Sequence, residues 1–295
     1  MKENCIITCM FGEMYWEFAR FAPYVIWKRT KQYKNRSDIK FINITRPENF
    51  DIYGRYASIL VPFILKDESK YRSNCFRLDN ITNEEYISII KSFKDQFKDR
   101  YNILETIYPD ISKHQFGNKN QFPKDKMNYN YLPRISNSEV INNYMNGKPV
   151  VVLAPRYRAG FRRNWPYWNE LYNLISNNQK LIDKYNFVIC GRSPDYVPDY
   201  KNRFLDVNKM DQNINISLIG LTMTCMKKAV LTVGSQSAIP NISLLFGVHA
   251  LEWGHQKHLH TVTYNVKKTK VTFLEDNDYT IKPKIVFQEM LKILN

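Results

Sequence analysis

Apolar residues in the first hundred positions form short β-branched runs separated by stretches with helical spacing. The runs that predict strands lie at 5–10, 39–44 and 57–65. The stretches that predict helices lie at 15–30 and 83–97, and the second follows a capping pattern from Thr82 to Glu85. We expect the first helix to kink or restart at Pro23, and Pro62 to weaken the end of the third strand. Strands that alternate with helices predict an α/β fold.

The second half of the chain repeats this alternation after a polar interruption. The strands predicted there lie at 150–154, 187–190, 204–207 and 230–233. The helices predicted there lie at 168–175, 216–228 and 282–294. The interruption, 109–133, is rich in Lys, Asn and Tyr and has no period, which predicts a linker. Its Tyr129 and Tyr131 are candidates for stacking on nucleic acid, or for anchoring a solvated connection. The expected parts are an N-terminal domain over 1–135, a C-terminal domain over 148–281 and a terminal helix over 282–295.

The stretch 229–251 combines a strand, a turn of small residues and an apolar helix. The turn occupies 234–238 (GSQSA), and the helix expected behind Pro240 closes at Gly247. Backbone N–H groups and the helix dipole at such a turn attract an anion, for which a phosphate is the obvious ligand. The alternative is a turn that is small only because helix and strand pack closely.

The charge balance points to an acidic partner. Lys and Arg number 43 against 28 Asp and Glu, a formal net charge of +15. Such a field attracts polyanions or acidic surfaces but indicates no chemistry, and biased codon usage is another source of this composition. Five cysteines without CxxC spacing indicate reduced, mostly buried thiols, so we expect a cytoplasmic protein.

Several classes of protein are not expected. No apolar run is long enough to span a membrane, and the first residues read as a strand rather than as a signal peptide. Walker, GxSxG and GxGxxG sequences do not occur. The cluster of His255, His258 and His260 lacks a Cys or acid to complete a zinc set, so no metal is expected.

Four arginines fall within eight residues of the loop after the strand at 150–154. They are Arg156, Arg158, Arg162 and Arg163. Loops after parallel strands lie at the edge where α/β sheets bind ligands, and arginines there suit a diphosphate through forked hydrogen bonds. A DNA-backbone contact and a solvated basic loop are the alternatives.

Four stretches, taken in order, resemble the heptosyltransferase-like glycosyltransferases. They are Gly12-Glu13, RRNWPYWNELYNLI at 162–175, FVICGRSPD at 187–195, and the helix, strand, turn and helix at 217–247. The resemblance implies the GT-B fold, an α/β fold of two Rossmann-like domains that face each other across a cleft. It also implies transfer of a sugar from a nucleotide-sugar donor, such as a UDP-sugar, to a hydroxyl group, without a metal or other cofactor.

The resemblance implies that the N-terminal domain is the acceptor side and that the C-terminal domain binds the nucleotide sugar, and it assigns donor contacts by position. The residues assigned to the donor phosphates are Arg158, Arg163, Ser235, Gln236, Ser237 and Ala238. Those assigned to the nucleotide and its ribose are Gly191, Asp195 and Glu252. Gln236, Ala238 and Asn241 replace the Asp, Gly and His of the family. These changes alter the side chains offered to the sugar but keep the backbone N–H groups.

Glu13 is the candidate general base. The family carries an acid after its first strand, and transfer needs a carboxylate to take the proton of the acceptor hydroxyl. The alternative is an acid favoured at a helix N-terminus by the dipole. The candidates for contacts with the acceptor are Gly12, Tyr15, Trp16, Tyr53, Arg156 and Arg162.

The identity of the acceptor is inferred from the charge. A strongly basic cytoplasmic enzyme predicts double-stranded DNA that carries 5-hydroxymethylcytosine, as modified by the DNA glycosyltransferases of bacteriophages, which flip their target base. The second interpretation is transfer to lipopolysaccharide or another cell-surface glycan, the usual activity of the family. The third is a non-catalytic nucleic-acid-binding protein.

Overall fold

The computed structural model describes most of the chain. The described residues are 2–10, 16–64, 82–110, 121–130, 139–156, 164–191, 204–210, 218–255 and 265–295. Contacts divide the chain into two compact units, Met1–Arg134 and Ile135–Asn295. Each unit contains a parallel sheet of its own.

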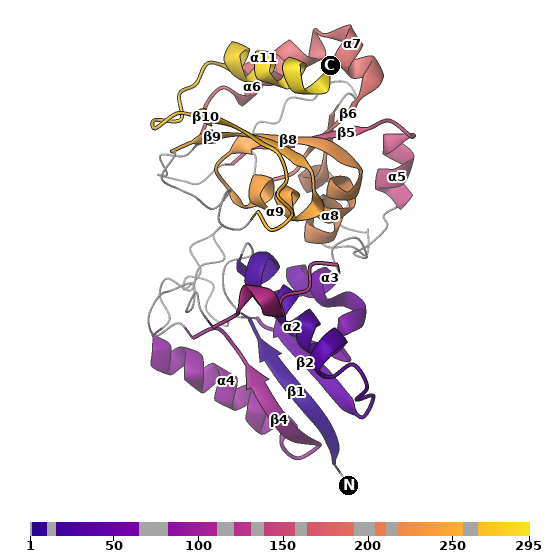
Figure 1. Cartoon of the computed structure of the whole chain (residues 1–295), viewed down its shortest axis with the longest axis vertical. Coiled ribbons are helices and arrows are strands. Elements are labelled where there is room, and N and C mark those ends of the chain that lie inside the picture. Colours follow the sequence, from indigo (N-terminus) through magenta and orange to yellow (C-terminus); the bar gives the residue numbers. More distant parts are fainter. Residues whose placement is uncertain are drawn as a thin grey trace. The chain divides into compact units, whose positions relative to one another are not determined.

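The N-terminal unit is built on a four-stranded parallel sheet (Figure 1). Its strands are β1 (Glu3–Cys9), β2 (Ile39–Thr45), β3 (Ile59–Pro62) and β4 (Tyr101–Ile107), in the order β3-β2-β1-β4. The pattern of apolar residues predicted the first three strands but not β4. Most side chains of this edge strand are partly or fully exposed, so its sequence, YNILETI, contains no buried apolar run.

The described segment from Trp16 to Gln32 is helical, as predicted, and changes type near Pro23. The π-helical turn η1 (Glu17–Phe21) passes into α2 (Ala22–Trp27), which passes into a second π-helical turn, η2 (Lys28–Gln32). Pro23 stands in the first turn of α2, where a missing backbone N–H costs least. The expected kink or restart at this proline takes the form of a change from π-helical to α-helical hydrogen bonding, and the helix continues without a break.

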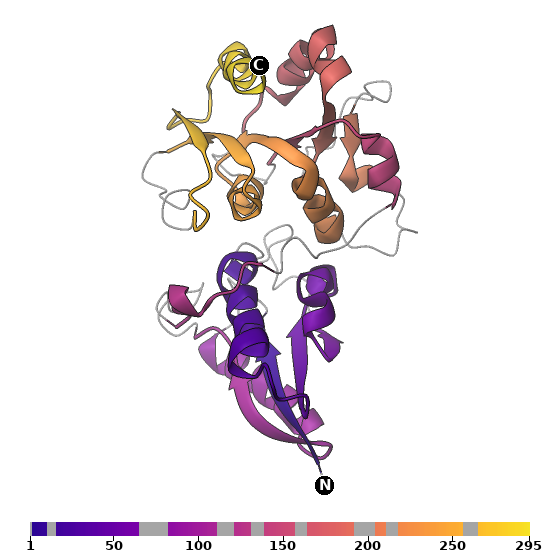
Figure 2. The same ribbon diagram turned by 45° about the vertical axis from the view of Figure 1, so that its right-hand side comes forward.

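Helix α4 (Asn83–Phe97) covers one face of this sheet, and α2 lies on the other (Figures 1 and 2). It begins with the predicted capping box, in which Thr82 and Glu85 each bond the other's backbone. Its Tyr86 and Ile90 pack against apolar side chains of β1 and β2. The short helical turns of this unit are η3 (Pro47–Asn49), α3 (Phe50–Tyr53), η4 (Gly54–Tyr56) and η6 (Lys124–Lys126).

Residues 121–130, inside the predicted linker, pack against the N-terminal unit. The hydroxyl of Tyr129 donates a hydrogen bond to the carbonyl of Ala19 at 2.8 Å. The backbone N–H of Asn128 donates to the carbonyl of Pro23 at 3.0 Å. Tyr129 therefore serves as an anchor of this segment.

The C-terminal unit is built on a six-stranded parallel sheet. Its strands are β5 (Val150–Ala154), β6 (Asn186–Ile189), β7 (Phe204–Asp206), β8 (Ala229–Ser235), β9 (His249–Gly254) and β10 (Val271–Glu275), in the order β10-β9-β8-β5-β6-β7. All five residues of β5 are buried, as expected of a strand covered on both faces. The edge strand β10, like β4, is partly exposed and was not predicted.

Helices cover both faces of the C-terminal sheet (Figure 1). On one face lie α6 (Trp168–Ser176), α7 (Gln179–Lys184) and α11 (Pro283–Leu294). On the other face lie α5 (Glu139–Met145), α8 (Leu218–Lys228) and α9 (Ala238–Phe246). The rings of Trp165, Trp168 and Trp253 meet on the first face, with centroids 4.7 to 5.7 Å apart. Val286 and Met290 of α11 belong to the same buried cluster, so the terminal helix is part of this core.

The connections change direction beside the first strand of each sheet. The chain runs from β1 to β2 and β3 on one side and returns to β4 on the other side of β1. In the C-terminal unit it runs from β5 to β6 and β7 and returns to β8. Open α/β sheets bind ligands outside the carboxyl ends of the strands at such switch points. The expected sites are therefore the ends of β1 and β4 and the ends of β5 and β8.

Gly234 allows β5, β8 and α9 to approach closely at the second switch point. A Cβ at this position would lie 2.9 Å from the carbonyl oxygen of Ala154 and 3.1 Å from Cγ of Pro240. We expect Gly234→Ala to lower the free energy of unfolding by about 1–3 kcal/mol through overpacking, as measured by urea denaturation. Val230 on the same strand is 43% exposed, so Val230→Ala is the control and should cost less than about 1 kcal/mol. Equal losses would contradict the role given to Gly234.

Candidate functional site

The end of β8 leads into α9 through a short turn made by Gln236 and Ser237. Ser237 is the extended N-cap of α9, and the helix begins at Ala238 and ends at Gly247 in the left-handed conformation. The first N–H groups of a helix, here those of Ala238 and Ile239, have no acceptor within it. Because Ser237 and Ala238 are partly exposed, an anion can reach these groups and the positive end of the dipole.

Gln236 is turned into the protein. Its side chain is 4% exposed, and its Oε1 accepts a hydrogen bond from the hydroxyl of Tyr279 at 3.2 Å. Its backbone N–H donates to the carbonyl of Trp253 at 2.9 Å. Gly254 makes room for this side chain, because a Cβ there would lie 2.6 Å from Oε1. Gln236 therefore supports the turn by joining it to the end of β9.

Ser235 and Glu252 are both fully buried. Ser235 is the last residue of β8 and pairs with Trp253, while Glu252 pairs with Gly234. Of the four turn residues predicted to bind phosphate, Ser237 and Ala238 are the accessible ones. Glu252 was predicted to contact the nucleotide, but its side chain has no exposed surface through which to do so.

Arg156 follows β5, on the other side of the switch point. Its Nη1 donates a hydrogen bond to the backbone carbonyl of Gln236 at 3.3 Å. This bond joins the ends of β5 and β8 and holds a guanidinium group beside the turn that opens α9. Arg156 was predicted as an acceptor contact and as part of the cationic loop, and it lies at the predicted donor turn.

Gly191 follows the end of β6, the strand beside β5. Its φ is +127°, and a Cβ there would lie 2.5 Å from the carbonyl oxygen of Pro155. Its own carbonyl accepts a hydrogen bond from Nδ2 of Asn208 at 2.6 Å. Gly191 is thus required for the close approach of the ends of β5 and β6, and only its backbone can meet a nucleotide.

Several predicted site residues lie outside the described part of the chain. They are Gly12, Glu13, Tyr15, Arg158, Arg162, Arg163 and Asp195. Their roles stay predictions. Of the three clustered histidines, His255 is described and the other two are not. Among the described side chains, no group of three or more His, Cys, Asp or Glu is placed to hold a metal ion. None of the described helices is both long and apolar enough to cross a membrane.

Trp16 and Tyr53, the two described aromatic candidates for the acceptor, are buried in the N-terminal unit. They are 7% and 1% exposed. The guanidinium of Arg20 lies 5.8 Å from the centroid of the Trp16 ring. The hydroxyl of Tyr53 donates a hydrogen bond to Glu17 at 2.6 Å. Rings enclosed in this way act as core packing rather than as surfaces for stacking on a flipped base.

Glu17, which was not among the predicted site residues, is a fully buried carboxylate. Its Oε1 accepts hydrogen bonds from Thr45 Oγ1 at 2.7 Å and from Tyr53. Its Oε2 accepts one from Asn49 Nδ2 at 2.5 Å. Burial raises the pKa of Glu17 from 4.5 to about 7, although the three hydrogen bonds and the charge of Arg46 lower it. In the sequence, the signals that could have indicated this cluster were an acid within a mostly apolar helix and polar residues directly after a buried strand.

No protein-family model matches the sequence, and no curated protein sequence matches it. A glycosyl transferase of family 9 from Veillonella parvula is 9% identical, with a TM-score of 0.57, and the match covers 100% of this chain and 98% of that one. The ADP-heptose LPS heptosyltransferase II of E. coli is 11% identical, with a TM-score of 0.56 and coverage of 100% and 98%.

The chain has the GT-B fold. The predicted fold class, an α/β protein with two parallel sheets, is confirmed. A putative UDP-N-acetylglucosamine 2-epimerase from Listeria monocytogenes also matches, at 8% identity, with a TM-score of 0.54 and coverage of 100% and 88%. Transferases and an epimerase share this architecture, so the likeness shows the fold and not the reaction.

The raised pKa of Glu17 makes stability depend on pH. Between pH 4.5 and about 7 the folded state keeps a proton that the unfolded state releases, so stability falls as the pH rises through this range. At about 1.4 kcal/mol per unit of pKa, a rise in the pKa of this size corresponds to a change in folding stability of up to about 3 kcal/mol. We expect the stability of the wild type relative to Glu17→Gln to fall by that amount between pH 4.5 and pH 8, measured by urea denaturation.

The matched control is Glu48→Gln, because Glu48 is an exposed acid of the same unit. Its difference from the wild type should stay nearly constant with pH. A constant difference for Glu17→Gln as well would mean that Glu17 is ionised with an ordinary pKa in the folded state.

Proposed function

We propose that the chain is a glycosyltransferase that moves a sugar from a nucleoside diphosphate sugar to a hydroxyl group. The observation that supports this most directly is the accessible N-terminus of α9 at a switch point, with Arg156 bonded beside it. Helix N–H groups and a guanidinium that converge on one place suit a diphosphate. By their names, the neighbouring folds work on ADP-heptose and UDP-N-acetylglucosamine, which are sugars of this donor class.

The proposed reaction follows from these groups. The acceptor oxygen attacks the anomeric carbon, and the bond from that carbon to the diphosphate breaks with its electron pair on the leaving phosphate. The N-terminus of α9 and Arg156, with Arg158 and Arg163 from the same loop, neutralise the charge that develops. Glu13 takes the proton of the acceptor hydroxyl. Because arginines and N–H groups supply the neutralising charge, the proposal requires no metal.

A pair of substitutions at Ala238 tests the donor site. Glu and Gln are nearly the same size, and a carboxylate in the first turn favours the helix through its dipole, so both variants should fold. In the Ala238→Glu variant, the introduced carboxylate should repel a diphosphate. Its affinity for ADP or UDP should therefore be at least about tenfold lower than that of the Ala238→Gln variant. Isothermal titration calorimetry measures both affinities.

A thermal-shift screen of ADP, UDP, GDP and CMP and their sugars identifies the nucleotide to titrate, because a ligand that binds the folded state raises its apparent stability. If no nucleotide raises the melting temperature, the chain is not a nucleotide-sugar transferase. Equal affinities of the two Ala238 variants would move the donor site away from α9. A chain that only binds nucleic acid would likewise give a flat screen.

Glu13→Gln tests the proposed base. The amide cannot accept the hydroxyl proton, so sugar transfer should fall by at least about a hundredfold, while donor affinity stays close to that of the wild type. Release of nucleoside diphosphate in the presence of acceptor reports transfer, and calorimetry reports donor binding. Glu48→Gln is again the control. If Glu13→Gln retains activity, another group takes the proton.

Two acceptor classes have support of different kinds. The net charge of +15 supports DNA that carries 5-hydroxymethylcytosine, whereas the named lipopolysaccharide enzyme supports a glycan. Incorporation of labelled sugar into hydroxymethylated DNA and into deacylated lipopolysaccharide, measured side by side, distinguishes them. A gel shift that weakens with salt and requires the hydroxymethyl group would favour DNA.

A further inference from the structure

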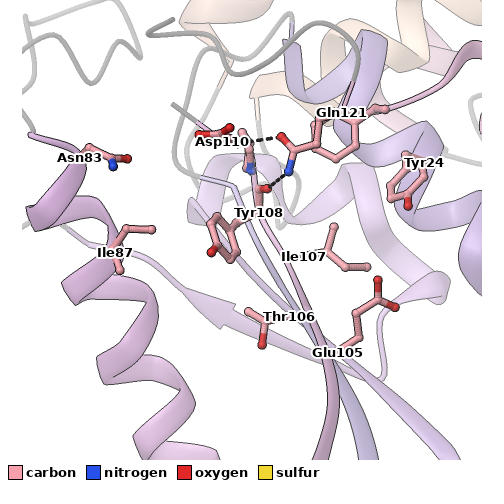
Figure 3. Close-up of a pocket in the computed structure, with 11 residues that line it drawn as sticks. Tyr24, Asn83, Ile87, Glu105, Thr106, Ile107, Tyr108, Asp110 and Gln121 are labelled. Carbon is pink, nitrogen blue, oxygen red and sulfur yellow. Dashed lines mark hydrogen bonds between the residues drawn. The ribbon is translucent and has the colours of Figure 1, made fainter. Parts of the chain in front are cut away.

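The N-terminal unit has a pocket of about 480 Å³ at the carboxyl end of β4 (Figure 3). Its walls come from α2, the start of α4, the end of β4 with residues 108–110, and residues 121–122. The volume falls within the range of small-molecule sites. The proposed function uses none of the residues that line it.

The pocket lies beside the end of β4, one of the two strands that meet at the switch point of the N-terminal sheet. β4 pairs with β1, and Ile107 at the end of β4 stands beside Thr8 near the end of β1. This is the place where an open α/β sheet binds its ligand. In sequence, β1 leads on to Glu13, so the pocket adjoins the strand that precedes the proposed base.

Hydrogen bonds hold the polar wall of the pocket in place. The side chain of Gln121 donates from Nε2 to the carbonyl of Tyr108 at 2.6 Å. Its Oε1 accepts from the backbone N–H of Asp110 at 2.7 Å, and Figure 3 shows both bonds. The side-chain amide of Gln121 thereby holds the backbone that follows β4 at two points, Tyr108 and Asp110. A wall fixed in this way is preorganised, which lowers the entropy lost on binding.

Apolar surface faces the pocket from two helices. The ring of Tyr24 on α2 packs against Phe122, with centroids 5.1 Å apart. On α4, Ile87 is 41% exposed at the pocket, and Asn83 offers its amide from the same helix (Figure 3). The pocket therefore combines ring and aliphatic surface with hydrogen-bonding groups.

The described lining of the pocket contains two acids, one of which is paired with a lysine. Glu105 and Asp110 line it, and its described lining includes no Lys or Arg. Nζ of Lys28 holds the two carboxylate oxygens of Glu105 at 2.6 and 2.9 Å, and the hydroxyl of Tyr33 bonds it at 3.3 Å. Lys28 fixes this carboxylate but is itself 5% exposed. Because Lys28 balances the charge of Glu105, Asp110 is the described lining carboxylate that disfavours a phosphate or carboxylate ligand.

We propose that this pocket binds an uncharged sugar ring of the acceptor substrate. Carboxylates only accept hydrogen bonds, so they suit a ligand rich in hydroxyl donors. Tyr24 and Ile87 suit the C–H face of the ring. That the sugar belongs to an acceptor rests on the proposed function, but the binding of sugar by the pocket does not. The pocket thereby favours a glycan acceptor over DNA, whose phosphates would meet Glu105 and Asp110.

Saturation-transfer-difference NMR on the full chain tests the pocket without any donor. The probes are the methyl glycosides of glucose, galactose and mannose, with glucuronic acid and glucose 6-phosphate as charged counterparts. We expect saturable binding of at least one neutral glycoside and none of the charged sugars. Binding of the charged sugars alone would overturn the inference.

Three variants locate the binding. Ile87→Trp fills the mouth of the pocket and should abolish the signal, whereas Ser88→Trp, at an exposed neighbouring position outside the lining, should preserve it. Asp110→Asn keeps the shape of the side chain and removes its charge. It should weaken binding of the neutral glycoside by roughly tenfold and allow glucuronic acid to bind. Circular dichroism verifies that each variant is folded.

The outcomes separate this inference from the proposed function. Donor binding at α9 without binding of any glycoside overturns the pocket assignment alone. Glycoside binding that Ile87→Trp leaves intact also overturns it. Glycoside binding without donor binding overturns the proposed function and leaves a carbohydrate site. If a hydroxymethylated oligonucleotide binds the wild type and Ile87→Trp abolishes that binding, the pocket belongs to DNA instead.

Discussion

Parallel strands can be joined only by crossovers that pass over a face of the sheet, and this constraint determines where both sheets of the chain can hold a ligand. The crossovers leave β1 and β5 on one side and return on the other. Two adjacent strand ends therefore diverge in each sheet, with no connection between them. The accessible end of α9 lies at one such place, and the pocket beside β4 lies at the other.

The C-terminal switch point is defined by close packing of backbone. Gly234, Gly191 and Gly254 each stand where a side chain would collide with a neighbouring carbonyl or with Gln236. Close packing leaves Ser235 and Gln236 buried and exposes the start of α9. What this place offers an anion is therefore mostly main chain, together with Arg156. The N–H groups at the start of α9 belong to the main chain, so they do not depend on the identity of the side chains at Gln236 and Ala238.

The N-terminal unit has a different electrostatic character. Its carboxylates are held by neutral donors, as at Glu17, or by a lysine behind them, as at Glu105. Burial of Glu17 raises its pKa to about 7, so this unit carries a group that titrates near neutrality within its core. The formal charge of +15 describes the whole chain and does not describe the pocket, whose described lining is acidic. Net charge bears on encounter with a partner, whereas local charge bears on what a site holds.

The sequence alone determined the fold class, because buried parallel strands must be apolar throughout and helices between them must be amphipathic. The sequence predicted the buried strand Val150–Ala154, the capping box at Thr82 and the end of α9 at Gly247. The partly exposed edge strands β4 and β10 carried no such signal. Only the tertiary structure decided that Trp16, Tyr53 and Ser235 are buried, that Glu17 gathers donors from β2 and the turn after it, and that a pocket forms beside β4. Burial and pockets arise from segments distant along the chain, and the spacing of residues within one segment does not report them.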